Sequence, residues 1–265
     1  MRVALGQLDM VWEDKEHSYK KAEKMAEEAA ASECDIIIFP EMSLTGFSMN
    51  LKKIGEDEKN SETVEKMQNL AQRLHMAIGF GWAALGKNPE DKGTNRFTLM
   101  ESSGRKLVDY VKLHPFSYGQ ENRYYEKGQE IVTVPFLGRM VGLFICYDLR
   151  FPEIFQAAAK KADIFFVIAN WPELRSAHWE TLLRARAIEA QAYVVGVNCV
   201  GKRDKMIYSG DSMAVDAMGN ILGRISNKEG ILICDLDDRA WSLRRKFATA
   251  ADRRESFYGE CFQKE

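Results

Sequence analysis

Hydrophobic and polar positions follow two different periods in the first part of the chain. Largely apolar runs at residues 2–8 and 34–40 predict strands. Residues 15–33 between them predict a helix, because apolar side chains recur there at helical spacing: Tyr19, Ala22, Met25, Ala26 and Ala29. A second helix is predicted from about residue 61, with one apolar face made of Val64, Met67, Leu70, Ala71 and Leu74.

The same patterns continue through the rest of the chain. Further strands are predicted at residues 76–85, 96–101, 106–113, 130–136, 139–146, 163–170, 192–198, 209–216, 220–226 and 230–237, and further helices near 153–161 and 176–191. Helices and strands alternate in each half, with runs of strands between, which predicts helices on the outside of sheets. No linker or low-complexity segment divides the chain, so we expect one domain over 1–265, ending in a charged tail at roughly 239–265.

Composition narrows the class of protein. With 265 residues and 46% hydrophobic residues, the chain can bury a substantial core. The 37 basic and 39 acidic residues nearly balance, so we expect a small-molecule partner rather than nucleic acid or a membrane surface. Five cysteines without a CxxC pair indicate a reducing compartment and no zinc site. We therefore expect a cytoplasmic protein without a membrane span, a metal or a cofactor.

Reactive side chains follow three of the predicted strands. Glu41 lies just beyond one strand, Lys112 ends a second, and Cys146 ends a third. In open α/β sheets, ligand sites form outside the carboxyl ends of the strands, so these three side chains can converge.

An acid, an amine and a thiol together suit acyl transfer. A free thiol has a pKa of about 8.5 and needs a base or a nearby cation to become an efficient nucleophile. Glu41 could take the thiol proton and later deliver it to a leaving amine. Lys112 and the backbone N–H of Tyr147 could stabilise the oxyanion that forms when a carbonyl is attacked.

Three motifs in this order resemble those of a known family. "FPEMSLTGF", "VKLHPF" and "CYDLRFPE" are similar to the signatures of the nitrilase superfamily of carbon-nitrogen hydrolases. The resemblance covers nearly the whole chain and implies an α/β fold, a four-layer α-β-β-α sandwich that forms dimers or larger assemblies. It implies Glu41 as general base, Lys112 as oxyanion stabiliser and Cys146 as nucleophile. It also implies Glu121 as a second glutamate that helps to position the lysine and the substrate.

Alternatives to this site remain open from the residues alone. A cysteine can also pair with a histidine, and His114 and His178 both lie near the motifs in sequence. Glu121 lies in a polar loop and could equally be a solvated acid.

The substrate is suggested by the second half of the chain. The stretch that begins at "CYDLRFPE" is similar to the ω-amidase branch, which converts 2-oxoglutaramate and 2-oxosuccinamate to 2-oxo acids and ammonia. Arg150 could hold a substrate carboxylate, and Trp171 and Trp179 could wall the pocket, although both tryptophans could be ordinary core residues. Arg175 is close to Trp171 in sequence. The alternatives are another amide, a carbamoyl amine or a nitrile as substrate, or a binding or scaffold protein without turnover.

Acidic residues interrupt the basic residues of the tail, which include Arg239, Arg244, Arg245, Lys246, Arg253 and Arg254. This pattern favours a solvated tail, or one that crosses to a second subunit, over a nucleic-acid-binding surface. Resemblance to ω-amidase-like enzymes favours a tail that packs across a dimer.

Overall fold

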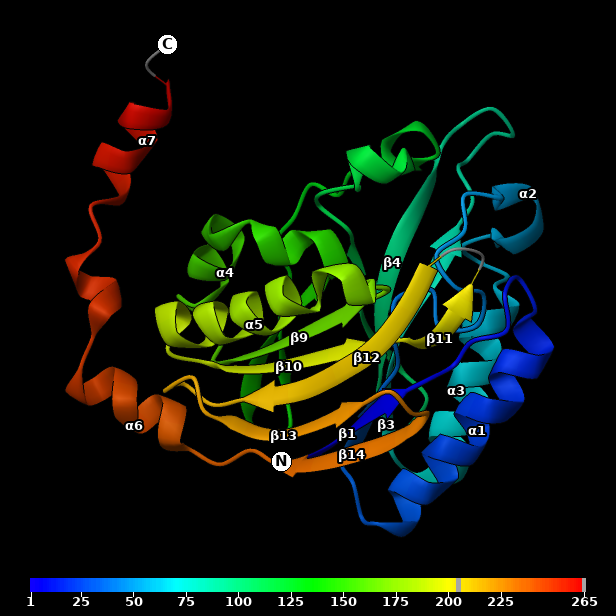
Figure 1. The fold of residues 1–265 in the computed structure, drawn as a ribbon, viewed down its shortest axis with the longest axis horizontal. Helices are drawn as coiled ribbons and strands as arrows, with labels where there is room; N and C mark the ends of the chain where they lie inside the picture. Colours follow the sequence, from blue (N-terminus) through cyan, green and yellow to red (C-terminus); the bar gives the residue numbers. More distant parts are fainter. Residues whose placement is uncertain (204–205, 264–265) are drawn as a thin grey trace.

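Two β-sheets lie face to face, and helices cover the outer face of each sheet (Figure 1). The computed structural model describes residues 1–203 and 206–263. One sheet carries α1 (Lys15–Ala31) and α3 (Glu62–Leu74), and the other carries α4 (Pro152–Ala158) and α5 (Ser176–Ala190). The predicted four-layer α-β-β-α sandwich is therefore confirmed.

The first sheet combines strands from both ends of the chain. Its members are β1 (Arg2–Gln7), β2 (Ile36–Ile38), β3 (Ala77–Ala84), β4 (Gly93–Met100), β5 (Lys106–Val111), β6 (Tyr125–Glu126) and β14 (Gly230–Asp235). Their order in space is β14-β1-β2-β3-β4-β5, and β6 pairs with β4. The strands β1, β2 and β3 run parallel, whereas β14 is antiparallel to β1.

The second sheet is continuous in sequence. Its members are β7 (Thr133–Phe136), β8 (Arg139–Ile145), β9 (Ile164–Ala169), β10 (Tyr193–Asn198), β11 (Val200–Arg203), β12 (Met206–Val215) and β13 (Ile221–Ser226). The order is β11-β12-β10-β9-β8-β7, and β13 pairs with β12. Since β8, β9 and β10 are parallel, their carboxyl ends meet at one edge of the sheet.

Alternate residues of the central strands face different layers of the core. In β9, Ile164, Phe166 and Ile168 pack between the two sheets, whereas Phe165 and Val167 pack against α4 and α5. Both faces of such a strand are covered, which explains why the strand appears in the sequence as an unbroken apolar run.

Local signals fix where the main helices begin. The Asp14 carboxylate accepts a hydrogen bond from the backbone N–H of His17 (3.1 Å) and so begins α1. The Ser61 hydroxyl accepts one from the N–H of Val64 (3.1 Å) and begins α3. Pro152 occupies the first turn of α4, where its missing N–H costs nothing.

Three short elements were not predicted: β6, β11 and the one-turn helix α2 (Leu51–Ile54). In β11, Lys202 and Arg203 hide the strand signal, and the strand forms because it pairs with β12, with Val200 opposite Ser209. This pairing is a tertiary effect that overrides local propensity.

The tail forms two further helices, α6 (Arg239–Lys246) and α7 (Glu255–Gln263). The Arg244 guanidinium fastens α6 to the body by donating hydrogen bonds to the carbonyl oxygens of Ala159, Ala162, Ala190 and Gln191, at 2.7–3.1 Å. Just beyond α6, Gln191 Nε2 donates to the Phe247 carbonyl (2.6 Å), and Lys160 pairs with Glu255 at the start of α7, but α7 lies apart from both sheets (Figure 1). Residues 264–265 of the predicted tail lie outside the described residues.

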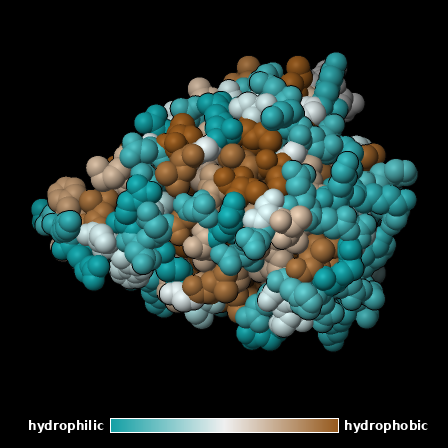
Figure 2. Space-filling model, turned by 90° about the horizontal axis from the view of Figure 1, so that it is seen from below, coloured by the Kyte–Doolittle hydropathy of each residue, from teal (hydrophilic) through white to brown (hydrophobic). Residues whose placement is uncertain are grey.

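Hydrophilic atoms cover most of the face shown in Figure 2, and hydrophobic atoms form separate areas between them. Among the described residues, no helix combines the length and the hydrophobicity that crossing a bilayer requires.

Candidate active site

Cys146 stands at the sharp turn that follows β8. The strand ends at Ile145, and residues Cys146–Arg150 form a short 3₁₀ turn. Cys146 has a φ angle of 47°, in the left-handed region that non-glycine residues rarely adopt. Such strain persists only where the surroundings enforce it, and here it brings the thiol to the wall of a pocket.

The Asp148 side chain stabilises this turn through hydrogen bonds. Its Oδ2 accepts hydrogen bonds from the Ile145 N–H (3.0 Å) and the Tyr110 hydroxyl (2.7 Å). Its Oδ1 accepts the N–H of His114 (3.0 Å) and lies 2.8 Å from the Nδ1 of the same residue. The carboxylate is fully buried, so these bonds hold the end of β8 against the segment that follows β5.

The two histidines of the alternative mechanism have other partners. Besides its contact with Asp148, the His114 ring stacks on Phe151 at 3.7 Å between ring centroids. The Nδ1 of His178 lies 3.2 Å from Arg150 Nη2. Neither histidine lines the pocket that contains Cys146, so the geometry favours a glutamate rather than a histidine beside the thiol.

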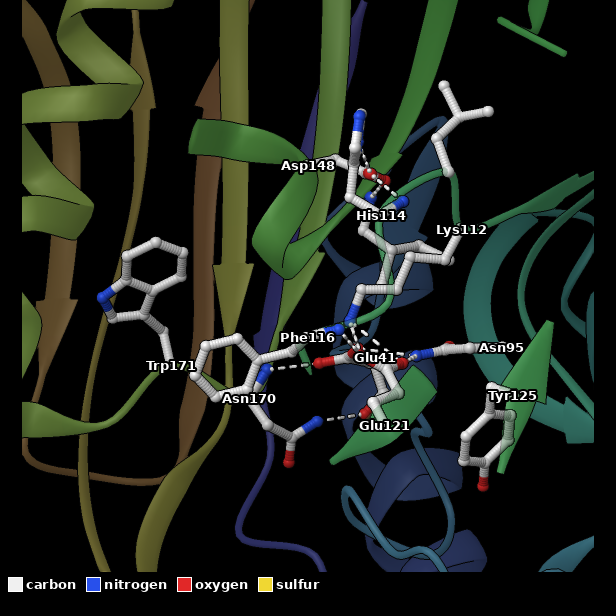
Figure 3. A network of polar contacts seen from close by, with 12 residues as sticks. Glu41, Asn95, Lys112, His114, Phe116, Glu121, Tyr125, Asp148, Asn170 and Trp171 are labelled. Carbon is white, nitrogen blue, oxygen red and sulfur yellow. Dashed lines mark hydrogen bonds and ion pairs between the residues drawn. The ribbon is translucent and has the colours of Figure 1, made fainter. Parts of the chain in front are cut away.

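Glu41, Lys112 and Glu121 form one fully buried cluster (Figure 3). The Lys112 ammonium lies 2.8 Å from Glu41 Oε1 and 2.8 Å from Glu121 Oε2. Lys112 is 71 positions from Glu41 and 9 positions from Glu121 in the sequence. The structure thus brings the three predicted residues together. The alternative of a solvated Glu121 is wrong, because this side chain is 0% exposed.

Two asparagines that the sequence analysis did not single out complete the cluster. Asn95 Nδ2 donates to Glu41 Oε1 (2.7 Å) and to Glu121 Oε1 (2.8 Å). The Asn170 N–H donates to Glu41 Oε2 (3.0 Å), and Asn170 Nδ2 donates to the Glu41 carbonyl (2.6 Å). Asn170 directly follows β9, so its place at a strand end was the available signal. Asn95 lies within β4 and gave none.

Burial and charge act against each other in this cluster. Burial raises the pKa of the Cys146 thiol well above its ordinary value, and the Glu41 carboxylate adds to this effect while Lys112 opposes it. Burial disfavours the charged form of Lys112, but Glu121 and Glu41 outweigh it and hold the Lys112 pKa well above its ordinary value. Burial also raises the pKa of Glu121, against the opposing effect of Lys112. The resting site therefore holds a neutral thiol beside an ammonium group.

The pocket beside Cys146 has a volume of about 780 Å³, within the range of small-molecule sites. Five of its lining residues are cationic: Lys21, Arg150, Arg175, Lys202 and Arg203. Asp9 is the one acidic lining residue in the part of the chain that the structure describes, and Arg203 already pairs with it at 3.4 Å. Aromatic rings supply much of the remaining wall, and the pocket as a whole suits an anionic ligand.

Arg150 and Trp171 both line this pocket, as predicted for residues that touch substrate. The Arg150 guanidinium lies over the Trp171 ring, 4.9 Å from the ring centroid. Trp171 is held in place because its Nε1 donates to the Arg175 carbonyl (2.8 Å) and its N–H donates to Asn198 Oδ1 (2.7 Å). Tyr147 also lines the pocket, and its ring packs against Phe116 at 4.9 Å.

Trp179 does not lie where a substrate contact was predicted. It is fully buried in the layer between the second sheet and α5, and its Nε1 donates to the Asp211 carbonyl (2.9 Å). Its ring lies 5.5 Å from the Trp171 ring, so it supports the pocket wall from behind. The core alternative holds because this position of α5 faces the sheet.

No group of three or more histidine, cysteine, aspartate or glutamate side chains within residues 1–203 and 206–263 could hold a metal ion. The donors at the site are instead an ammonium, two amides and backbone N–H groups, which suit carboxylates and oxyanions.

The four-layer sandwich, with a thiol and a Glu-Lys-Glu cluster at its strand ends, defines a hydrolase class rather than a binding fold alone. The family model described as carbon-nitrogen hydrolase matches residues 2–245, and the chain belongs to this family. The predicted family is confirmed, and the protein is an enzyme that hydrolyses amides.

Relatives with known names share most of the chain. Omega-amidase YafV of Yersinia enterocolitica is 36% identical over 222 residues, which cover 83% of each chain. The 2-oxoglutaramate amidase of Bacillus subtilis is 30% identical over 255 residues, which cover 95% of this chain and 97% of the relative. A carbon-nitrogen hydrolase superfamily protein of Xanthomonas campestris, solved with an arsenic adduct in its active site, superposes with a TM-score of 0.88. It is 29% identical, and the match covers 96% of this chain and 97% of that one.

Proposed function

We propose that this enzyme is an ω-amidase, which hydrolyses the terminal amide of a small 2-oxo acid such as 2-oxoglutaramate or 2-oxosuccinamate. The observation that carries this proposal is that Cys146 shares its pocket with an excess of cationic side chains. The names of the relatives from Yersinia enterocolitica and Bacillus subtilis support the same substrate class.

Arg150 and Arg175 are the groups best suited to hold the substrate carboxylate. Both line the pocket, and neither has a carboxylate within 4.0 Å among the described residues. Each guanidinium instead lies near an aromatic ring, Arg150 over Trp171 and Arg175 over Phe116 at 5.7 Å. Apart from the 3.2 Å contact between Arg150 Nη2 and His178 Nδ1, their side-chain donors are available among the described residues for contacts with a carboxylate.

The same charge pattern disfavours amino-acid amides. Glutamine carries an ammonium group that needs an anionic partner, and Asp9, the acidic lining residue, is already paired with Arg203. A 2-oxo acid has a neutral carbonyl at this position, so it leaves no buried cation unpaired.

In the first half of the proposed reaction, Cys146 attacks the amide carbonyl carbon. Glu41 takes the thiol proton as the carbon–sulfur bond forms, which avoids the costly formation of a free thiolate in a buried site. The Lys112 ammonium and the Tyr147 N–H stabilise the tetrahedral oxyanion. The carbon–nitrogen bond then breaks, Glu41 returns the proton to nitrogen, and ammonia leaves a thioester on Cys146.

In the second half, water attacks the thioester carbonyl. Glu41 takes a proton from this water, the same oxyanion donors act again, and the carbon–sulfur bond breaks. The thiol recovers its proton, and the 2-oxo dicarboxylate is released. Glu121 contributes by holding Lys112, because its two oxygens lie 2.8 and 3.1 Å from the ammonium nitrogen.

The test is ammonia release from five compounds: 2-oxoglutaramate, glutamine, asparagine, an N-carbamoyl amino acid and a simple nitrile. We expect 2-oxoglutaramate to react fastest and the Cys146→Ala variant to lose this activity. The matched control is Cys261→Ala, which removes an exposed thiol and should keep full activity. Faster turnover of another compound would identify that compound as the substrate in place of 2-oxoglutaramate. Full activity in Cys146→Ala would refute the mechanism.

A chain without turnover on any of the five compounds would call for a broader panel of amides, and the scaffold alternative would follow only if the thiol were also unreactive. Thiol reactivity separates the cases, since a catalytic Cys146 should be alkylated by iodoacetamide and protected by an amide substrate.

A further inference from the structure

Asn95 bridges the two buried glutamates from the side opposite to the thiol pocket. It extends from β4, is 0% exposed, and places its Nδ2 between Glu41 Oε1 and Glu121 Oε1 (Figure 3). An amide nitrogen only donates hydrogen bonds, so the two oxygens that face it must both be acceptors.

Every carboxylate oxygen of the pair is engaged in this way. Glu41 Oε2 accepts from the Asn170 N–H, and Glu121 Oε2 accepts from the Phe116 N–H and from Lys112. Among the described residues, Glu41 Oε2 accepts one hydrogen bond and keeps a lone pair for the Cys146 proton, whereas each of the other three oxygens accepts two. These hydrogen bonds fix the positions of both side chains.

Glu41 and Glu121 share Lys112 as their cationic partner. Lys112 carries a single positive charge, and two acids that share a site tend to hold a proton between them. Burial indeed raises the pKa of Glu121, whereas the hydrogen bonds from Asn95 lower it. The amide supplies positive charge density to both acids without adding a second cation.

The other end of the side chain is unused. Asn95 Oδ1 is buried and has no hydrogen-bond partner among the described residues. A buried acceptor without a donor is unfavourable, so the contact that stabilises this side chain is the one made by Nδ2.

We infer that Asn95 is a positioning residue that holds Glu41 and Glu121 in register, so that Glu41 is placed to accept the Cys146 proton. The inference rests on the proposed role of Glu41. It assigns a residue within β4 a role in the reaction, although Asn95 does not line the pocket.

The test is the pH dependence of kcat/KM in Asn95→Leu, which keeps much of the volume and removes the donor. Without the donated bond, Glu121 has a higher pKa, and when protonated it no longer pairs with Lys112 as a carboxylate. We expect the acid limb of the profile to move up by about one pH unit, which is about tenfold in activity on that limb. KM should stay near the wild-type value, and the loss should be recovered at higher pH.

The matched control is Thr98→Val, which alters a buried polar residue on the same strand. The Thr98 hydroxyl accepts a hydrogen bond from Trp82 Nε1 (2.8 Å) and does not contact the glutamates. This variant should lose stability but keep the wild-type acid limb. A folded Asn95→Leu variant with an unchanged acid limb would overturn the inference.

Two further measurements keep the test decisive. If Asn95→Leu does not fold, Asn95→Asp is used, because it has the same shape and cannot donate when ionised; the same upward shift is expected. If the wild type does not hydrolyse 2-oxoglutaramate, the proposed substrate fails, and the acid limb is measured from the rate of Cys146 alkylation by iodoacetamide. That rate needs only the thiol and its base, so an unshifted limb there refutes the role of Asn95 independently of the substrate.

Discussion

Arg150 and Arg184 show how the surroundings of an arginine decide what it can bind. Arg184 donates to the Gly219 carbonyl (3.0 Å) and lies 3.9 Å from Glu180, so its donors are used on the protein surface. Arg150 lies over Trp171 and faces the pocket. Both residues are arginines, yet only Arg150 lines the pocket that contains Cys146.

We predict that Arg150→Gln raises KM for 2-oxoglutaramate by about 10- to 100-fold and leaves kcat within a few-fold of the wild type. The reason is the loss of a charge-assisted contact to the carboxylate, worth about 1.5–3 kcal/mol. Steady-state kinetics measure both constants, and Arg184→Gln is the control that should change neither. An unchanged KM would show that another lining cation, such as Arg175, holds the carboxylate.

At this scale the sequence predicted reactive residues better than supporting ones. Glu41, Lys112 and Cys146 stand at strand ends, where a polar side chain after an apolar run is visible in the pattern. Asn95 occupies one position inside β4, and nothing local shows that it faces two acids. Trp179 was assigned to the pocket because the sequence does not show which side of α5 faces the sheet.

Among the elements, the short turn after β8 depends on a single carboxylate. Asp148 accepts hydrogen bonds from groups on three segments and holds Cys146 in its left-handed conformation. The reactive thiol is therefore placed by a buried acid that does not itself line the pocket.

We predict that Asp148→Asn destabilises the protein by about 3 kcal/mol and lowers kcat strongly. The new amide group would face N–H donors of Ile145 or His114, which leaves buried polar groups unpaired. Urea unfolding gives the stability, and ammonia release gives kcat. Asp252→Asn, on the exposed tail, is the control and should leave both unchanged. Wild-type kcat in Asp148→Asn would show that other contacts place the thiol.

Strands were predicted correctly where both of their faces are buried. The pairing of strands that are far apart in the sequence was not predicted. The runs that became β2 and β9 are apolar throughout, and β8 is apolar after Arg139, so their pattern is unambiguous. The strand β14 was expected, but its place beside β1 was not, because these strands are more than 200 residues apart. Local periodicity carries no information on such partners.

At the scale of the whole molecule, the tail beyond α6 exposes several aromatic side chains to solvent. Phe247 is 63% exposed and Phe262 79% exposed, and α7 lies apart from both sheets (Figure 1). Exposed aromatic side chains on an extended segment are costly in water and suit an interface. The proposal that the tail packs against a second copy of the chain therefore stands, as a homodimer or larger assembly.

We predict that the enzyme sediments as a dimer or larger species and that Phe257→Ser combined with Phe262→Ser shifts it toward the monomer. Both aromatic residues lie on α7 and would lose buried apolar area in the assembly. Analytical ultracentrifugation measures the mass, and Leu137→Ser, at another exposed apolar site, should leave it unchanged. A wild type that is monomeric at high concentration would contradict the prediction.

The pairing of β1 with β14 also has a consequence for biosynthesis. The chain emerges from the ribosome amino end first, and β14 begins only at Gly230. Until then, β1 has β2 on one side and an unpaired edge on the other, and such edges readily pair with foreign strands. The first sheet can close only after β14 has been made, so the β1 edge stays open to aggregation until then.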